Sequence, residues 1–219
     1  METDALRKSR FAELVAEAAA CVRCQAMCER TAVLSERNGD LAARILFVGE
    51  APGRKGADRT RIPFSGDQSG KNFDRFLMAA GLTRDQIFIT SAALCNPRND
   101  SGANRRPTLA ELRNCSAYLR RLIQILDPAV IVTLGSVALE ALNLIHYHHL
   151  TLKEAAAKIY EWDGRLLVPI YHPSPQVLAS HRREAEQLRD YQTITKAVRR
   201  SGISSRSPIT KVTAFGTPY

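Results

Sequence analysis

The stretch ILFVGEAPGRKGADRTRIPFSGD (residues 45–67) begins with an apolar run and continues as a loop rich in glycine and proline. Four consecutive apolar residues before a glycine are typical of a short strand buried on both faces, as in a parallel sheet. In open α/β sheets, the loops that leave the carboxyl ends of such strands bind the ligand. This stretch therefore predicts both the fold class and the position of a site.

The rest of the chain alternates between strand-like and helix-like segments. Further strands are predicted at residues 86–92, 129–135 and 165–172, and helices at 3–27, 69–82, 108–126, 136–144 and after His181. Thr108 and Glu111 form a capping-box pattern at one helix start. Such alternation predicts a single α/β domain over residues 1–200, with a central four-stranded parallel sheet flanked by helices. We expect residues 201–219 to form a flexible tail.

The net charge and the apolar content of the chain indicate which kind of partner it binds. The chain of 219 residues has 31 Lys+Arg against 22 Asp+Glu, a net charge of +9 that favours an anionic partner, most commonly nucleic acid. A basic surface that serves only solubility is the alternative. No stretch approaches the ~18 apolar residues of a membrane span, and the N-terminus lacks the apolar core of a signal peptide. We expect a soluble, cytoplasmic monomer with no membrane partner.

The cysteines suggest a metal centre. An intracellular setting argues against disulfides. Cys21 and Cys24 form a C-x-x-C pair, and Cys95 and Cys115 would complete four thiolates, enough for a [4Fe–4S] cluster or a structural zinc. Buried free cysteines are the alternative. Cys28 is left over, although it could replace Cys24.

The loop after the first strand matches neither the dinucleotide-binding nor the Walker pattern of glycines. It offers a Pro-Gly turn, carboxylates at Glu50 and Asp58 and an aromatic ring at Phe64, while His172 begins the segment HPSP after the last strand. An acid, an aromatic ring and a histidine around one pocket suit cleavage of the N-glycosidic bond of a flipped base.

These motifs resemble those of the uracil-DNA glycosylase superfamily, in its iron–sulfur branches, families four and five. The segment GEAPG is similar to family four, whereas GADRTRIPFSGDQSG and HPSP are closer to family five. The resemblance extends from about Cys21 to Thr195. It implies a three-layer fold, a cluster bound by the four cysteines, and a monofunctional DNA glycosylase that flips a pyrimidine, uracil by default.

The resemblance also implies roles for individual residues. Phe64 would stack on the base and His172 would face its carbonyl oxygen. Asp58 matches an acid proposed to position water, and Glu50 is the second choice, with a structural carboxylate that accepts loop N–H bonds as the alternative. The base pocket would further contain Ala51, Pro52, Gly53, Ser91 and Asn96. The residues expected to enter the duplex or hold phosphates are Gln176, Val177, Leu178, Arg105, Arg106, Arg182 and Arg183.

Two positions depart from the superfamily pattern. Ala51 stands where its best-known water-activating aspartate lies, and Ser91 stands where an asparagine usually reads the uracil edge. Asn96 or a water could replace that asparagine. Alternatively, the base could be a hydroxymethylated or glucosylated cytosine of phage DNA, removed in anti-phage defence. A damaged-DNA-binding module with weak catalysis is the remaining alternative.

Overall fold

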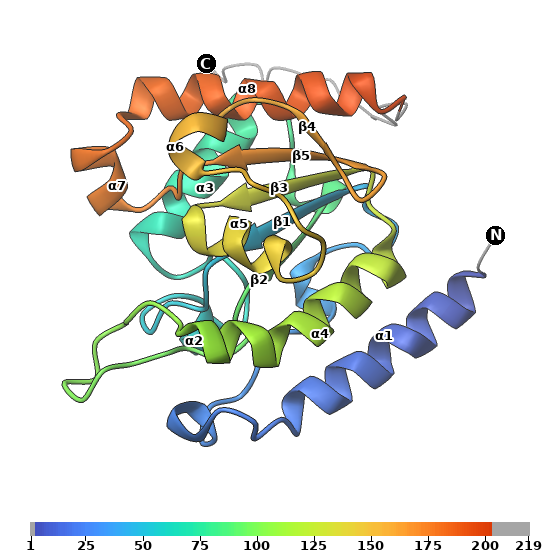
Figure 1. Cartoon of the computed structure of the whole chain (residues 1–219), viewed down its shortest axis with the longest axis vertical. Coiled ribbons are helices and arrows are strands. Elements are labelled where there is room, and N and C mark those ends of the chain that lie inside the picture. The colour runs from blue at the N-terminus through green and yellow to red at the C-terminus, as the bar shows by residue number, and fades with distance from the viewer. Residues whose placement is uncertain (1–2, 203–219) are drawn as a thin grey trace, which may run out of the picture.

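A mostly parallel sheet forms the centre of the computed structural model, which describes residues 3–202 (Figure 1). Its strand order is β2-β1-β3-β5-β4. The strands are β1 (Ile45–Gly49), β2 (Ile87–Ser91), β3 (Val130–Leu134), β4 (Tyr160–Trp162) and β5 (Arg165–Ile170). β1, β2, β3 and β5 are parallel and confirm the predicted sheet. A fifth strand, β4, was not predicted; it pairs antiparallel with β5 and is too short to show a periodic pattern.

Helices cover both faces of this sheet, so the predicted single α/β domain with three layers is confirmed (Figure 1). The helices are α1 (Asp4–Ala19), α2 (Ala57–Thr60), α3 (Gln68–Ala79), α4 (Leu109–Leu126), α5 (Ser136–Asn143), α6 (Leu152–Ala155), α7 (Pro175–Ser180) and α8 (Glu184–Arg200). α1, α4 and α5 pack on one face, and α3 and α8 pack on the other. Across residues 3–202, no helix has the length and apolar character needed to cross a bilayer.

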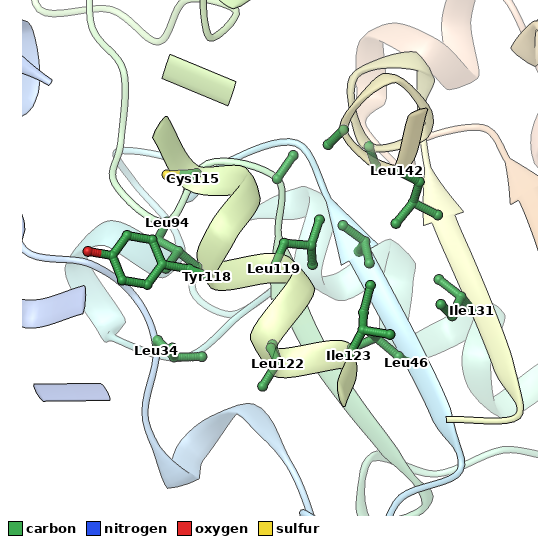
Figure 2. Packing of buried hydrophobic residues seen from close by; sticks show 14 of the residues in the cluster. Leu34, Leu46, Leu94, Cys115, Tyr118, Leu119, Leu122, Ile123, Ile131 and Leu142 are labelled. Atoms are coloured by element: carbon green, nitrogen blue, oxygen red, sulfur yellow. The ribbon is translucent and has the colours of Figure 1, made fainter. Parts of the chain in front are cut away.

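The apolar strands alternate their side chains between two buried clusters. In β1, Leu46 and Val48 join the cluster under α1, α4 and α5, whereas Ile45 and Phe47 join the cluster under α3 and α8. Figure 2 shows the α4 side of the first cluster, including Leu46 and Ile131 of the sheet and Leu142 of α5. Because both faces are buried, the strands read as continuous apolar runs.

The structure confirms the predicted start of α4 and corrects the predicted end of α1. The predicted capping box is present, since Thr108 Oγ1 accepts from the Glu111 amide and Glu111 accepts from the Thr108 amide. The first helix was expected to reach residue 27 but ends at Ala19, after the last buried position of its apolar stripe, Ala18. Residues 21–28 therefore form a loop with a 3₁₀ turn at Gln25–Met27. Of the expected tail, residues 203–219 lie outside the described part of the chain.

Candidate active site

A cavity of about 520 Å³ opens at the carboxyl ends of the parallel strands. Loops that follow β1, β2 and β5 form its walls, as the strand-end argument predicted. It brings together the predicted residues Glu50, Ala51, Pro52, Gly53, Phe64, Ser91, Asn96, Arg105, His172, Gln176 and Val177. The predicted residues outside this lining are Asp58, Arg106, Leu178, Arg182 and Arg183.

The Phe64 ring forms one wall of the cavity. It stacks on Phe73, with ring centroids 4.8 Å apart, and lies 5.5 Å from the His172 ring. Gly49 ends β1 beneath it, and a Cβ at Gly49 would lie only 3.1 Å from the Phe64 ring. Glycine at the strand end therefore lets the ring lie against the pocket floor. The ring is well placed to stack on a planar base.

The backbone of Phe64 is held in an uncommon conformation by an arginine that the sequence analysis missed. Phe64 has φ of 49°, a left-handed value that is rare for an aromatic residue. Arg84 Nη2 donates to the Phe64 carbonyl at 2.6 Å, and Arg84 Nη1 donates to the Pro63 carbonyl at 3.0 Å. Asp74 in turn accepts from Arg84 Nε at 2.7 Å. No local pattern could reveal a contact between residues so far apart in sequence.

His172 faces the cavity as a neutral imidazole. Burial lowers the pKa of His172 to about 4, and the negative charge of Asp67 opposes this shift only in part. The chain around it is fixed, because Gln187 donates to the His172 carbonyl at 3.2 Å and Asn72 donates to the Pro173 carbonyl at 2.9 Å. A neutral imidazole in a fixed position can donate a hydrogen bond to an oxygen on which negative charge develops.

The free energy of unfolding is expected to show the shifted pKa of His172. The unfolded chain protonates this histidine near pH 6.5, whereas the folded chain does so near pH 4. The stabilisation is therefore complete above pH 6.5 and is lost as the pH falls towards 4, by about 3 kcal/mol. Urea unfolding of wild type and His172→Gln at about pH 7 and pH 4 measures this loss. A difference between the two proteins that does not change with pH would contradict the assignment.

Glu50 contributes a carboxylate with no bound partner. It directly follows β1, lines the cavity, and makes no side-chain hydrogen bond or ion pair with any residue in the range 3–202. Burial raises the pKa of Glu50, while the positive charge of Arg106 opposes the shift. The alternative role of accepting loop N–H bonds is not what the structure shows. The carboxylate is instead available to a water or a ligand.

Asp58, the first-choice acid, lies outside the cavity lining and is engaged elsewhere. Arg98 Nη2 donates to Asp58 Oδ2 at 2.5 Å, and Arg98 Nε donates to Asn96 Oδ1 at 2.5 Å. Asn96 Nδ2 donates to the Pro52 carbonyl at 2.6 Å and to Asn104 Oδ1 at 3.0 Å. This network ties the loop after β2 to the loop after β1. The Asn96 amide is thus committed to holding the loop, which leaves Ser91 as the polar side chain at the end of β2.

The cysteine side chains gather without forming a metal site. The pKa of the Cys95 thiol is raised to about 12, mainly by burial and in smaller part by the neighbouring thiols of Cys115, Cys21 and Cys24. Cys21 and Cys95 pack against the buried cluster that contains Cys115, and Cys24 Sγ accepts from Asn114, the residue before Cys115. Cys28 is exposed and is not among the charges that act on Cys95. Over residues 3–202, no three cysteine, histidine or acidic side chains have the arrangement of a metal site.

Most of the arginines expected to bind phosphates are paired with carboxylates. Arg105 forms two hydrogen bonds to Glu111, at 2.6 and 2.8 Å, and Arg106 contacts Glu140 at 2.7 Å. Arg182 binds Asp190 through two nitrogens, at 2.7 and 2.9 Å. Arg183 is exposed and precedes α8.

The segment after His172 contains a helix that the sequence analysis did not predict. α7 begins after Ser174, whose Oγ accepts from the Val177 amide at 3.4 Å. A serine followed by proline is a helix-start signal that could have revealed it. Gln176 lines the cavity, whereas Leu178 packs against the buried cluster under α3 and α8.

The sequence of this chain is similar to those of a known protein family and of several of its members. A family model described as "Uracil DNA glycosylase superfamily" matches residues 36–195. A type-4 uracil-DNA glycosylase of Archaeoglobus fulgidus is 36% identical over 151 residues, which cover 67% of this chain and 73% of that protein. A type-4 enzyme of Thermotoga maritima is 33% identical and covers 70% and 76% of the two chains. A type-5 uracil-DNA glycosylase of Pyrobaculum aerophilum is 34% identical over 166 residues, 68% and 70% of the two chains.

Proposed function

This chain belongs to the uracil-DNA glycosylase superfamily, and from that premise we propose that it excises uracil from DNA by hydrolysing the N-glycosidic bond. The resemblance inferred from the sequence motifs is confirmed by these comparisons. The observation that carries the proposal is the identity to proteins named type-4 and type-5 uracil-DNA glycosylase over about two thirds of the chain. The names of these relatives do not favour either alternative function, the excision of a modified cytosine or the binding of damaged DNA without catalysis.

The cavity supplies groups for each part of the proposed reaction. The flipped uracil would stack on Phe64, and Ser91, which makes no side-chain hydrogen bond within the described residues, would contact the base edge. As the bond between the sugar C1′ and the base nitrogen breaks, its electron pair moves onto the base. Neutral His172 would donate to the carbonyl oxygen that gains this charge.

His172 would act on the base, whereas Glu50 would act on the sugar. Its carboxylate would orient a water and favour the positive charge that develops at C1′. The water oxygen then bonds to C1′, and its proton passes to the carboxylate and from there to solvent. Glu50 is preferred over Asp58 in this proposal because Arg98 already holds the Asp58 carboxylate.

We also propose that Cys21, Cys24, Cys95 and Cys115 hold a [4Fe–4S] cluster, with a structural zinc as the alternative. The proximity of the four thiols supports this set, and their side chains would have to reorient to bind. A bound cluster would supply a structural cross-link rather than a redox step. It would join the loop after α1 to the loop after β2 and to α4. Action as a cytoplasmic monomer remains part of the proposal, since one chain provides the whole cavity.

A base-release assay tests the proposed function. Oligonucleotides that carry uracil, hypoxanthine, hydroxymethyluracil or glucosylated hydroxymethylcytosine are incubated with the protein, and abasic sites are cleaved by alkali. We expect cleavage at uracil. Cleavage only at the glucosylated cytosine would replace uracil as the substrate and make Ser91 part of an altered pocket. Binding without cleavage of any substrate would overturn the enzymatic proposal.

A further inference from the structure

A second hollow lies beside the cavity and is lined by Arg54, Lys55, Arg59 and Gly66. Arg54 and Lys55 line both the hollow and the base cavity, so the two share a wall. Three of the four lining residues are cations, whereas the cavity itself is lined by residues of mixed character. Because the hollow adjoins the cavity, a group covalently attached to a base in the cavity could reach it.

Within the described part of the chain, the three cations have no anionic partner. Arg54, Lys55 and Arg59 are exposed, and none forms an ion pair with the described residues. This contrasts with Arg105, Arg106 and Arg182, whose charges are offset by carboxylates.

The backbone around the hollow is well defined. The Arg54 amide donates to Asn104 Oδ1 at 3.0 Å, which anchors the loop to the segment after β2. Gly66 has φ of +94°, and a Cβ there would lie 2.6 Å from Thr60 Cγ2. The same point lies 3.4 Å from the Lys55 carbonyl and 3.6 Å from Arg59 Nη2. The absence of a side chain at Gly66 therefore leaves room beside the Arg59 guanidinium.

We propose that Arg54, Lys55 and Arg59 bind a phosphodiester group of the DNA next to the flipped nucleotide. This inference rests on the proposed function, because it is the base in the cavity that would bring its own sugar–phosphate to the shared wall. Unpaired cations on a concave surface attract phosphate oxygens, and their binding releases counterions from the DNA. The segment GEAPGRKG thus both lines the base cavity and holds the backbone. The main phosphate contacts lie here rather than at the paired arginines.

The salt dependence of DNA binding tests this site without requiring catalysis. The probe is a duplex with a non-cleavable 2′-fluoro uracil nucleotide, and the variant is Arg54→Gln/Lys55→Gln/Arg59→Gln. Each phosphate contact adds about 0.9 to the slope of log K against log salt. Because the three cations bind one phosphate, we expect the variant to reduce the magnitude of the slope by about 0.9 and to weaken binding most at low salt.

A variant with the same loss of charge provides the control. Lys8→Gln/Lys196→Gln/Arg199→Gln removes three exposed cations, one from the N-terminal part of α1 and two from the C-terminal part of α8. The N-terminal end of α1 and the C-terminal end of α8 lie on the side of the molecule away from the strand carboxyl ends (Figure 1). We expect its slope to match wild type. Equal slopes for the two variants, or an unchanged slope in the first, would overturn the phosphate site. If wild-type protein releases no uracil but the slope of the first variant still differs from that of wild type, only the proposed chemistry is overturned and the phosphate site stands.

Discussion

Replacing Glu50 with glutamine is expected to slow uracil release by about 10²–10⁴-fold in single-turnover assays. Glu50 lines the cavity, and its carboxylate binds no other side chain within residues 3–202. Glutamine keeps the size of the side chain but cannot accept a proton from water or carry a negative charge near the sugar. The loss should therefore appear in the maximum rate, whereas DNA affinity should change little.

The pH profile separates Glu50 from the other candidate groups. Burial raises the pKa of Glu50 above its usual value, and the active form is the ionised carboxylate. The wild-type rate should fall as the pH drops through this raised pKa, before His172 protonates near pH 4. The Glu50→Gln variant should lack that decline.

Asp58→Asn is the informative comparison for Glu50→Gln. Asp58 is bound by Arg98 and lies outside the cavity lining, so its replacement should mainly lower stability by freeing Arg98. A Glu50→Gln protein with nearly normal rates, together with an Asp58→Asn protein that has lost activity, would reverse the assignment.

The parts of the fold with a strong local pattern could be predicted from the sequence. The strand Ile45–Gly49 is recognisable because a strand buried on both faces requires continuous apolar residues. The start of α4 is recognisable because Thr108 and Glu111 satisfy each other's amides within four residues. The cavity followed from the strand-end rule once these elements were placed.

The parts that depend on which side chains pair with one another could not be predicted. Asp58 and Glu50 look equivalent in the sequence. They differ because Asp58 is paired with Arg98, 40 residues away, and with Arg61. Arg105 and Arg182 looked like free cations until Glu111 and Asp190 were found beside them. A sequence does not show whether an arginine or lysine side chain forms an ion pair. The sequence could therefore indicate a basic protein but not the location of its binding surface.

Cys95→Ser is expected to abolish the bound metal centre. Wild-type protein purified without oxygen should contain about four iron atoms and four sulfides per chain if the centre is [4Fe–4S], or about one zinc if it is structural zinc. Serine is a poor ligand for either, so metal analysis and visible absorption should show that the variant has lost its centre. The thermal midpoint should also fall, because the loops after α1 and β2 would no longer be joined.

Cys28→Ser is the matched control for this loss. Cys28 belongs to the same loop as Cys21 and Cys24, but it is exposed and is not among the thiols that raise the pKa of Cys95. We expect this variant to keep the full metal content and thermal midpoint, which would assign the centre to the other four cysteines. Loss of metal in Cys28→Ser with retention in a Cys24→Ser variant would instead place Cys28 in the ligand set. Wild-type protein with neither iron nor zinc would leave five free thiols, and the support for the N-terminal loop would have to come from packing alone.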